Sequence, residues 1–284
     1  MIDIQNQTDD RQIDIDQVGV SGLRSPIVVL DRHSERQSTV ASLNMSVALP
    51  HHFKGTHMSR FIEVLNEHRG ELTMRTMPAL LRDLKSKLDA ASARVEVSFP
   101  YFIERAAPAS GAKALMDYES WFHGESNGKG DDFVLGVRVP VTSLCPCSKA
   151  ISDYGAHNQR GYISIEVRSE VDEHGHPELI WLEELVEVAE ASASAPVYAL
   201  LKRSDERHVT MQAYDNPVFV EDMVRNVAAR LKNDARARWF RVQAVNHESI
   251  HNHGAFASLQ WRRGALRETV IDSTKNWMCA QETM

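Results

Sequence analysis

The amino-acid sequence predicts an α+β fold in which two ββααββ units follow one another along the chain. Stretches of alternating apolar and polar residues indicate half-buried strands, and stretches with apolar residues at helical spacing indicate amphipathic helices. A polar segment, SNGKGDD at 126–132, separates the two sets of elements. Each unit is expected to form a small antiparallel sheet with one face covered by helices. Unpaired outer edges of such sheets favour oligomerisation, which predicts barrels closed between subunits.

The first predicted unit spans residues 25–125 and follows an N-terminal arm, residues 1–24. Its helices are predicted to start after Thr56, the expected cap, and at Met77, ending near residue 91. The apolar faces are expected to contain Met58, Phe61, Ile62 and Leu65 in the first helix, and Leu80, Leu81, Leu84 and Leu88 in the second. The predicted strands are 26–30, 42–49, 93–103 and 114–125.

The second predicted unit spans residues 131–263 and precedes a C-terminal tail, residues 264–284. One helix is predicted over 181–191, and a longer one over 217–237 with a proline at its start. The predicted strands are 133–142, 161–171, 239–248 and 253–263.

Composition limits the classes of function. The chain has 284 residues, of which 43% are hydrophobic and 25% charged, as is ordinary for a soluble globular protein. A net charge of −7 argues against a general nucleic-acid-binding protein, and no apolar run is long enough to span a bilayer. The acidic N-terminal segment does not resemble a signal peptide. Three cysteines do not make a disulfide framework, so a reducing cytoplasm is expected.

The segment PVTSLCPCSKAISDYGAHNQRGYISIE at 140–166 carries the most chemically informative residues. Cys145 and Cys147 lie one residue apart, and His157 follows them on a predicted loop between two strands. Thiolate and neutral imidazole both bind borderline or soft divalent metals. One cysteine is expected to bind metal while the other serves as acid, base or nucleophile. Two buried thiols beside a surface histidine are the alternative that these residues leave open.

Acidic residues and histidines elsewhere give weaker signals. Glu248 and His251 lie in ESIHNH between the last two predicted strands, where they suit proton transfer or metal binding, or form a polar hairpin loop. Glu221 begins a predicted helix, where an acid is also simply favourable. Glu206 lies in LLKRSDERHVT, a predicted loop, where it is otherwise a solvated acid.

A basic cluster in KGTHMSR stands at the start of the first predicted helix. A helix N-terminus combined with cations is suited to phosphate. The cluster consists of Lys54, His57 and Arg60, and the residues that could extend it are Arg160, Lys202 and Arg203.

Five segments together resemble the type IB GTP cyclohydrolase I family. They are KGTHMSRF, PVTSLCPCSKAISDYGAHNQRG, the PVYALLKRSDE run, NPVFVEDMVR and NHESIHNH, and the resemblance covers residues 26–263 in the same order. It implies the tunnelling fold, with two ββααββ modules per subunit and homotetramers whose sheets close barrels. It also implies conversion of GTP and water to 7,8-dihydroneopterin triphosphate and formate, the first step towards tetrahydrofolate and, in some cells, towards modified tRNA bases.

The same resemblance implies roles for individual residues. The implied ligands of a divalent metal, which is Zn, Mn or Fe, are Cys145, His157 and Glu206. The residues implied to lie near the reacting purine are Cys147, Glu248 and His251, and either histidine, His157 or His251, is a candidate for delivering protons. Glu221 is implied to anchor guanine, and the basic cluster, with Lys202 and Arg203, to bind the triphosphate.

Two other functions are compatible with parts of this pattern. The tunnelling-fold nitrile reductase of queuosine synthesis also holds a purine-like ligand with a glutamate and uses a cysteine. It would need an NADPH site, and its glutamate-serine-lysine signature is not found in this sequence. A metal-stabilised oligomeric scaffold is the non-enzymatic alternative, in which Cys145 and His157 are purely structural. Such a zinc site is normally closed by four protein ligands, which distinguishes it from an open catalytic site.

Overall fold

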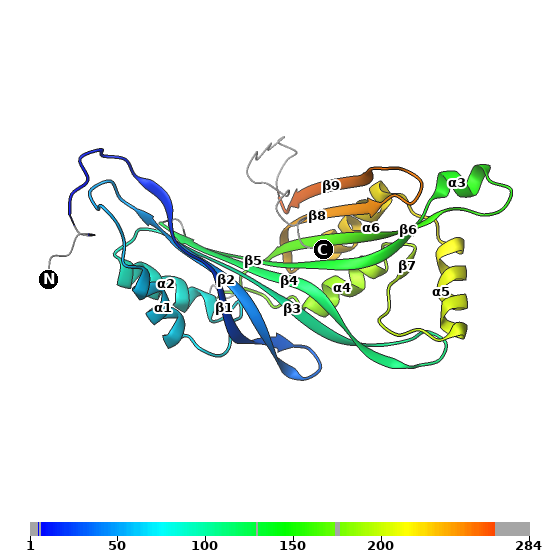
Figure 1. Cartoon of the computed structure of the whole chain (residues 1–284), viewed down its shortest axis with the longest axis horizontal. Coiled ribbons are helices and arrows are strands. Elements are labelled where there is room, and N and C mark those ends of the chain that lie inside the picture. Colours follow the sequence, from blue (N-terminus) through cyan, green and yellow to red (C-terminus); the bar gives the residue numbers. More distant parts are fainter. Residues whose placement is uncertain (1–4, 6, 129, 174–176, 265–284) are drawn as a thin grey trace.

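Among the residues that the structure describes, nine β-strands form one antiparallel sheet (Figure 1). The structure is a computed structural model and describes residue 5 and residues 7–128, 130–173 and 177–264. Neighbouring strands follow the order β1-β2-β3-β4-β5-β6-β8-β9, and the two-residue β7 pairs with β5 off this path. The sheet therefore has β1 and β9 at its two edges within the described chain. No helix in this part of the chain is long and apolar enough to cross a membrane.

The first half of the sheet contains the elements in the predicted order: strand, strand, helix, helix, strand, strand. They are β1 (Ile15–Asp31), β2 (Glu35–Leu49), α1 (Met58–Glu67), α2 (Met77–Leu88), β3 (Ala93–Ala106) and β4 (Lys113–Asn127).

The second half contains three elements that were not predicted, the short α3 and β7 and the 13-residue helix α5. Its elements are β5 (Gly130–Leu144), α3 (Pro146–Ile151), β6 (Asn158–Ser169), α4 (Leu182–Glu190), β7 (Ala195–Pro196), α5 (Arg203–Asp215), α6 (Val220–Asn233), β8 (Ala237–His247) and β9 (Gly254–Arg262). The predicted tail lies outside the described residues from position 265 onward.

Strand β1 begins within the predicted arm, ten positions before residue 25. Two glycines conceal this part of the strand because they interrupt its alternation. A Cβ on Gly19 would lie 1.9 Å from the Met45 carbonyl oxygen, so only glycine permits this close approach to β2. Gly22 has φ +68° and donates its N–H to Asn44 Oδ1 at 2.9 Å. The register shifts between Val20 and Leu23 at the same place.

Helix α1 differs from its prediction at its cap and in its buried face. His57 is the N-cap rather than Thr56, and it makes no side-chain capping bond. The buried residues are Phe61 and Val64, whereas Met58 is 44% and Ile62 37% exposed. The helix therefore buries a narrower stripe than the predicted face. The prediction for α2 is confirmed, because all four of its predicted leucines are buried.

Helices α1, α2, α4 and α6 pack against one face of the sheet, where a continuous apolar core forms. Helix α2 contacts β3 and β4, α4 contacts β5, and α6 contacts β8 and β9. The core side of β5 presents Val137, Val139 and Val141, all fully buried. Burial of such side chains stabilises the fold by about 1.5–3 kcal/mol each.

The opposite face of the sheet is polar. Trp121, Gly136, Glu166 and Arg241 form one cross-strand row over β4, β5, β6 and β8. Glu166 accepts hydrogen bonds from Trp121 Nε1 at 3.2 Å and from Arg241 Nε at 2.8 Å. A Cβ on Gly136 would lie 2.1 Å from the indole of Trp121, so the glycine leaves the space that the ring occupies.

Candidate active site

Cys145 directly follows β5 and caps the short helix α3. Pro146 is the first residue of α3, a position where its missing N–H is not needed. The Cys145 Sγ accepts from Ser148 N at 3.5 Å, and Ser148 Oγ donates back to the Cys145 carbonyl at 3.2 Å. The predicted turn around the cysteines is thus a capped helix. Cys145 is partly buried and Cys147 is exposed, and both are free thiols.

His157 lies directly across from Cys145, just before β6. Its carbonyl accepts from Cys145 N at 3.2 Å, and its own N–H donates to Ser148 Oγ at 3.2 Å. The Nδ1 atom of the half-buried imidazole lies 3.0 Å from Ser249 Oγ, in the loop after β8. A hydrogen bond to one ring nitrogen fixes the orientation in which the other can bind a metal or a proton.

The loop between β8 and β9 brings further predicted residues to the same end of the sheet. Glu248 is half-buried, and its Oε1 accepts from Gln159 Nε2 of β6 at 3.1 Å. His251 is exposed and stacks on His253 with ring centroids 5.1 Å apart. The α3 turn and the loop between β8 and β9 therefore lie at one end of the molecule (Figure 1). His157 contacts Ser249 of that loop.

The start of α6 is attached to the end of β5. Val218 N donates to the Leu144 carbonyl at 3.2 Å, and Ser143 Oγ donates to the Val218 carbonyl at 3.0 Å. Glu221 is exposed in the first turn of α6, which begins three residues later than predicted. An acid in a first helical turn is favoured by the helix dipole. Glu221 thus stands on an element that is hydrogen-bonded to the residue before Cys145.

Glu206 lies in a helix, so its prediction as a loop residue was wrong. It is exposed in the first part of α5, whose start is fixed by Asp205. The far end of α5 approaches α3, where Lys149 Nζ lies 4.3 Å from the ring centroid of Tyr214. Eight residues separate Glu206 from Tyr214, about 12 Å along a helix. Cys145 and His157 meet, but Glu206 of the same chain lies away from them.

The donor types of Cys145 and His157 suit a divalent metal, because thiolate and imidazole bind Zn²⁺ and similar ions. Among the described residues, no three His, Cys, Asp or Glu side chains stand close enough to hold one. Cys145 and His157 therefore suit a divalent metal, but the described part of one chain does not bring all three predicted ligands together.

Asp205 connects α5 to the first half of the chain. It accepts from Ala109 N and Ser110 N in the β3–β4 turn at 2.8 and 2.7 Å, and from Lys202 N at 2.8 Å. Ser110 Oγ donates a further bond at 2.6 Å. Burial alone would raise the pKa of Asp205, but these hydrogen bonds outweigh it and lower the pKa well below its ordinary value.

The predicted cations lie in two separate places. Lys54, His57 and Arg60 stand before and in α1, and Arg60 Nη1 donates to the Lys87 carbonyl at 2.9 Å. Arg160 is on β6, and Lys202 and Arg203 are exposed at the start of α5. Helices α1 and α5 lie at opposite ends of the long axis (Figure 1). One chain therefore does not bring these cations together.

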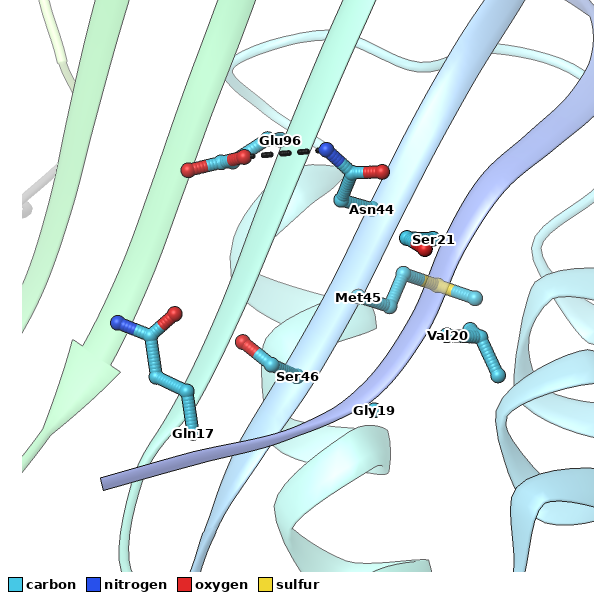
Figure 2. Close-up of a pocket in the computed structure, with 8 residues that line it drawn as sticks. All are labelled: Gln17, Gly19, Val20, Ser21, Asn44, Met45, Ser46 and Glu96. Atoms are coloured by element: carbon cyan, nitrogen blue, oxygen red, sulfur yellow. Dashed lines mark hydrogen bonds between the residues drawn. The ribbon is translucent and has the colours of Figure 1, made fainter. Parts of the chain in front are cut away.

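A surface hollow elsewhere contains none of the predicted site residues. Figure 2 shows it beside the register shift of β1, lined by residues of β1, β2 and β3. Asn44 Nδ2 donates to Glu96 Oε2 at 3.2 Å across it. Burial raises the pKa of Glu96, but the bond from Asn44 and the Arg94 charge lower it overall. This hollow is thus distinct from the cysteine–histidine end of the sheet.

Several contacts around the site involve residues that the sequence reasoning missed, among them Ser143, Gln159, Asn246 and Ser249. The first three occupy core-facing positions where apolar residues would continue the alternation. Asn246 follows Val242 and Ala244, and it is 2% exposed. A polar residue at the core-facing end of an alternating strand was the available signal.

Comparisons with known proteins bear on these observations. A family model described as type I GTP cyclohydrolase folE2 matches residues 1–257. A protein of Syntrophotalea carbinolica named GTP cyclohydrolase FolE2 is 54% identical over 261 residues, which cover 92% of this chain and 95% of the relative. A protein of the same name from Syntrophus aciditrophicus is 55% identical over 260 residues, covering 92% and 99%.

Solved structures with a similar fold include two uricases. The uricase of Arthrobacter globiformis matches with a TM-score of 0.50 at 11% identity, covering 91% of this chain and 98% of the other. That of Bacillus fastidious gives 0.54 at 7% identity, covering 87% and 94%. At such identities the likeness concerns the fold alone.

Proposed function

The chain belongs to the type I GTP cyclohydrolase folE2 family, and we propose that it converts GTP and water to 7,8-dihydroneopterin triphosphate and formate. This is the first step towards tetrahydrofolate. The observation that carries the proposal is the pairing of Cys145 with His157, in which the backbone N–H of Cys145 donates to the backbone carbonyl of His157 at 3.2 Å. The ESIHNH loop joins them through Ser249. The nitrile reductase is not favoured, because the family and its curated relatives are named for the cyclohydrolase.

For the metal we propose Cys145, His157 and Glu206 as ligands, with Zn, Mn or Fe as the ion. When bound, a divalent ion supplies a lower pKa for the water that attacks C8 of guanine. Because Glu206 lies away from the other two ligands in one chain, its carboxylate is proposed to come from a neighbouring subunit. Within the described residues, β1 and β9 have no neighbouring strand on their outer sides, which supports such an assembly.

Recognition of guanine is assigned to Glu221. Its carboxylate can accept hydrogen bonds from guanine N1–H and from the 2-amino group, neither of which adenine offers. The triphosphate is assigned to the basic cluster of Lys54, His57 and Arg60 together with Lys202 and Arg203. The basic cluster at α1 and the two cations at α5 stand at opposite ends of one chain. Only subunits of the proposed tetramer would bring them to the same nucleotide.

Proton transfer is assigned to the residues around the cysteine turn. Opening of the imidazole ring requires protons at its nitrogens, and an imidazole is suited to deliver them near neutral pH. His251 is exposed on its loop and free to approach a ligand, whereas His157 is oriented by Ser249. Glu248 and Cys147 complete the set near the reacting purine.

The proposed assembly follows from the fold as well. We propose a homotetramer of the tunnelling fold, in which residues 25–125 and 131–263 form two ββααββ modules and the sheets of different subunits close barrels. The uricase-like fold supports this arrangement. Because β1 begins at Ile15, the arm predicted over residues 1–24 is limited to the positions before that strand. The exposed free thiol of Cys147 supports the reducing cytoplasm as the location of the protein.

The test is GTP turnover by the purified protein, with metal content measured on the same preparation. Oxidised product would fluoresce as a pterin, and formate would form in equal amount. ATP is the matched control and should give no pterin. A metal-loaded preparation that produces neither formate nor pterin from GTP would refute the proposed activity. It would favour the alternative of a metal-stabilised oligomeric scaffold.

A further inference from the structure

Gln159 occupies a position where the fold favours an apolar side chain. It begins the core-facing row of β6 that continues through Gly161, Ile163 and Ile165. Only 7% of it is exposed, and it lies opposite Ser143 on β5. A buried amide costs free energy unless both its donor and its acceptor groups are hydrogen-bonded.

The amide of Gln159 is only half satisfied within the described chain. Its Nε2 donates to Glu248 Oε1 at 3.1 Å, whereas its Oε1 is buried and has no hydrogen-bond partner there. The orientation of the amide follows from chemistry, because turning it over would place the Oε1 oxygen against the Glu248 carboxylate. The chain thus retains an unfavourable unpaired oxygen in exchange for one N–H donor to Glu248.

Asn246 on the neighbouring strand shows a similar arrangement with a different partner. The single hydroxyl proton of Ser143 is donated to the Val218 carbonyl, so Ser143 Oγ accepts from Asn246 Nδ2 at 3.1 Å. The Asn246 Oδ1 is therefore the atom left buried without a partner in the described chain. Two buried amides at this end of the sheet each use their N–H group to fix an element of the candidate site.

We propose that Gln159 is a positioning residue that acts through Glu248, a role that rests on the proposed function. Its N–H occupies Oε1 of the carboxylate, which fixes the orientation of the Glu248 side chain. Gln159 itself is buried beneath the loop and does not contact the nucleotide. Its loss should therefore lower kcat for GTP with little change in KM.

The test is a double-mutant cycle on the full-length, metal-loaded protein. Gln159→Met, an unbranched apolar replacement, should lower kcat by about 10-fold or more, the range for groups that orient a site residue. In a Glu248→Ala background, where Gln159 has no carboxylate to hold, the same change should alter kcat by no more than about twofold. KM for GTP, metal content and Tm are measured for every variant.

Gln243→Met is the matched control. Gln243 is a half-buried amide of β8 on the polar face of the sheet, and the same replacement there should leave kcat unchanged. If Gln159→Met does not fold, Gln159→Asn, which shortens the amide by one methylene, replaces it in the same cycle.

An equal loss of kcat in both backgrounds, or no loss in either, would overturn the proposal. Failure of the unaltered protein to turn over GTP would instead refute the proposed function, so the two failures are distinguishable.

Discussion

The backbone N–H of Cys145 donates to the carbonyl oxygen of His157 at 3.2 Å, immediately beyond the last β5–β6 pair. This bond extends the β5–β6 pairing by one residue and joins the two ends of the loop that contains the cysteines. Cys145 and His157 are therefore held next to each other by backbone geometry before any ligand arrives. Such preorganisation lowers the entropic cost of binding.

Replacing Cys145 by alanine should abolish GTP turnover and lower the metal content, because it removes a soft ligand next to His157. Replacing Cys147, which is exposed one residue into α3, should reduce turnover more than metal content. Metal analysis and kcat on both variants provide the measurement. If Cys147→Ala lost metal as completely as Cys145→Ala, the roles of the two thiols would be reversed.

Removal of the Ser249 hydroxyl should weaken metal binding by about 10–100-fold, the usual effect of losing a partner of a metal-binding histidine. The reason is the 3.0 Å contact of Ser249 Oγ with His157 Nδ1, which orients the ring. Titration of metal into the apoprotein of Ser249→Ala checks this. Ser258→Ala, an exposed serine of β9, is the control, and an equal affinity for both variants would argue against His157 as a ligand.

Glu221→Gln should lose about 2–4 kcal/mol of transition-state stabilisation for GTP, because one acceptor becomes a donor facing a donor of the base. Metal content should stay unchanged. The measurements are kcat/KM and metal stoichiometry. Loss of metal would make Glu221 a ligand in place of Glu206, and unchanged kinetics would leave it an ordinary acid at a helix start.

A homotetramer with shared sites predicts complementation between inactive subunits. Cys145→Ala and Glu206→Ala should each be inactive alone, whereas mixed tetramers should regain part of the turnover, because some sites then combine an intact Cys145 with an intact Glu206. Sedimentation at micromolar concentration checks the assembly. An active monomer would exclude the barrel, and no recovery in verified mixed tetramers would place Glu206 and Cys145 of one site on the same chain.

The lowered pKa of Asp205 predicts a defined pH dependence of stability. A carboxyl whose pKa is lower in the folded state stabilises the fold above its unfolded pKa, 3.8, and this contribution is lost as the pH falls towards the folded value. Asp205→Asn should therefore lower Tm at pH 7 by about 2–4 °C. The difference from the unaltered protein should shrink only below about pH 4. A difference that is constant from pH 7 to pH 3 would contradict this cause.

The long strands and the apolar face of α2 were predictable because alternation and helical spacing are local properties of the sequence. Leu80, Leu81 and Leu84 show this in α2, where every predicted position is buried. Prediction failed where a tertiary contact replaces a local signal. Asp205 is an example, since the bonds that fix the start of α5 come from the β3–β4 turn, about a hundred residues away. The mixed-charge sequence around Asp205 alone predicts a loop.

The candidate site was predictable in its residue types and only partly in its geometry. Cys145 and His157 flank one excursion between paired strands, so their approach follows from the sequence. The distance from Lys54 to that pair depends on how the two halves are arranged, and the distance from Glu206 depends on how α5 packs within the second half. No local pattern encodes either arrangement. Gln159 was overlooked because an amide near the start of a strand is usually exposed to solvent, and only the structure shows that this one is buried.

The contact of Asp205 with the β3–β4 turn also bears on how far the chain can be divided. A polypeptide ending near residue 128 would leave Asp205 of the remainder without Ala109 and Ser110, and α5 would lose the clamp at its start. Two separately produced fragments should therefore recover an ordered α5 only on recombination. The two halves of the sheet are in this respect interdependent parts of one folding unit.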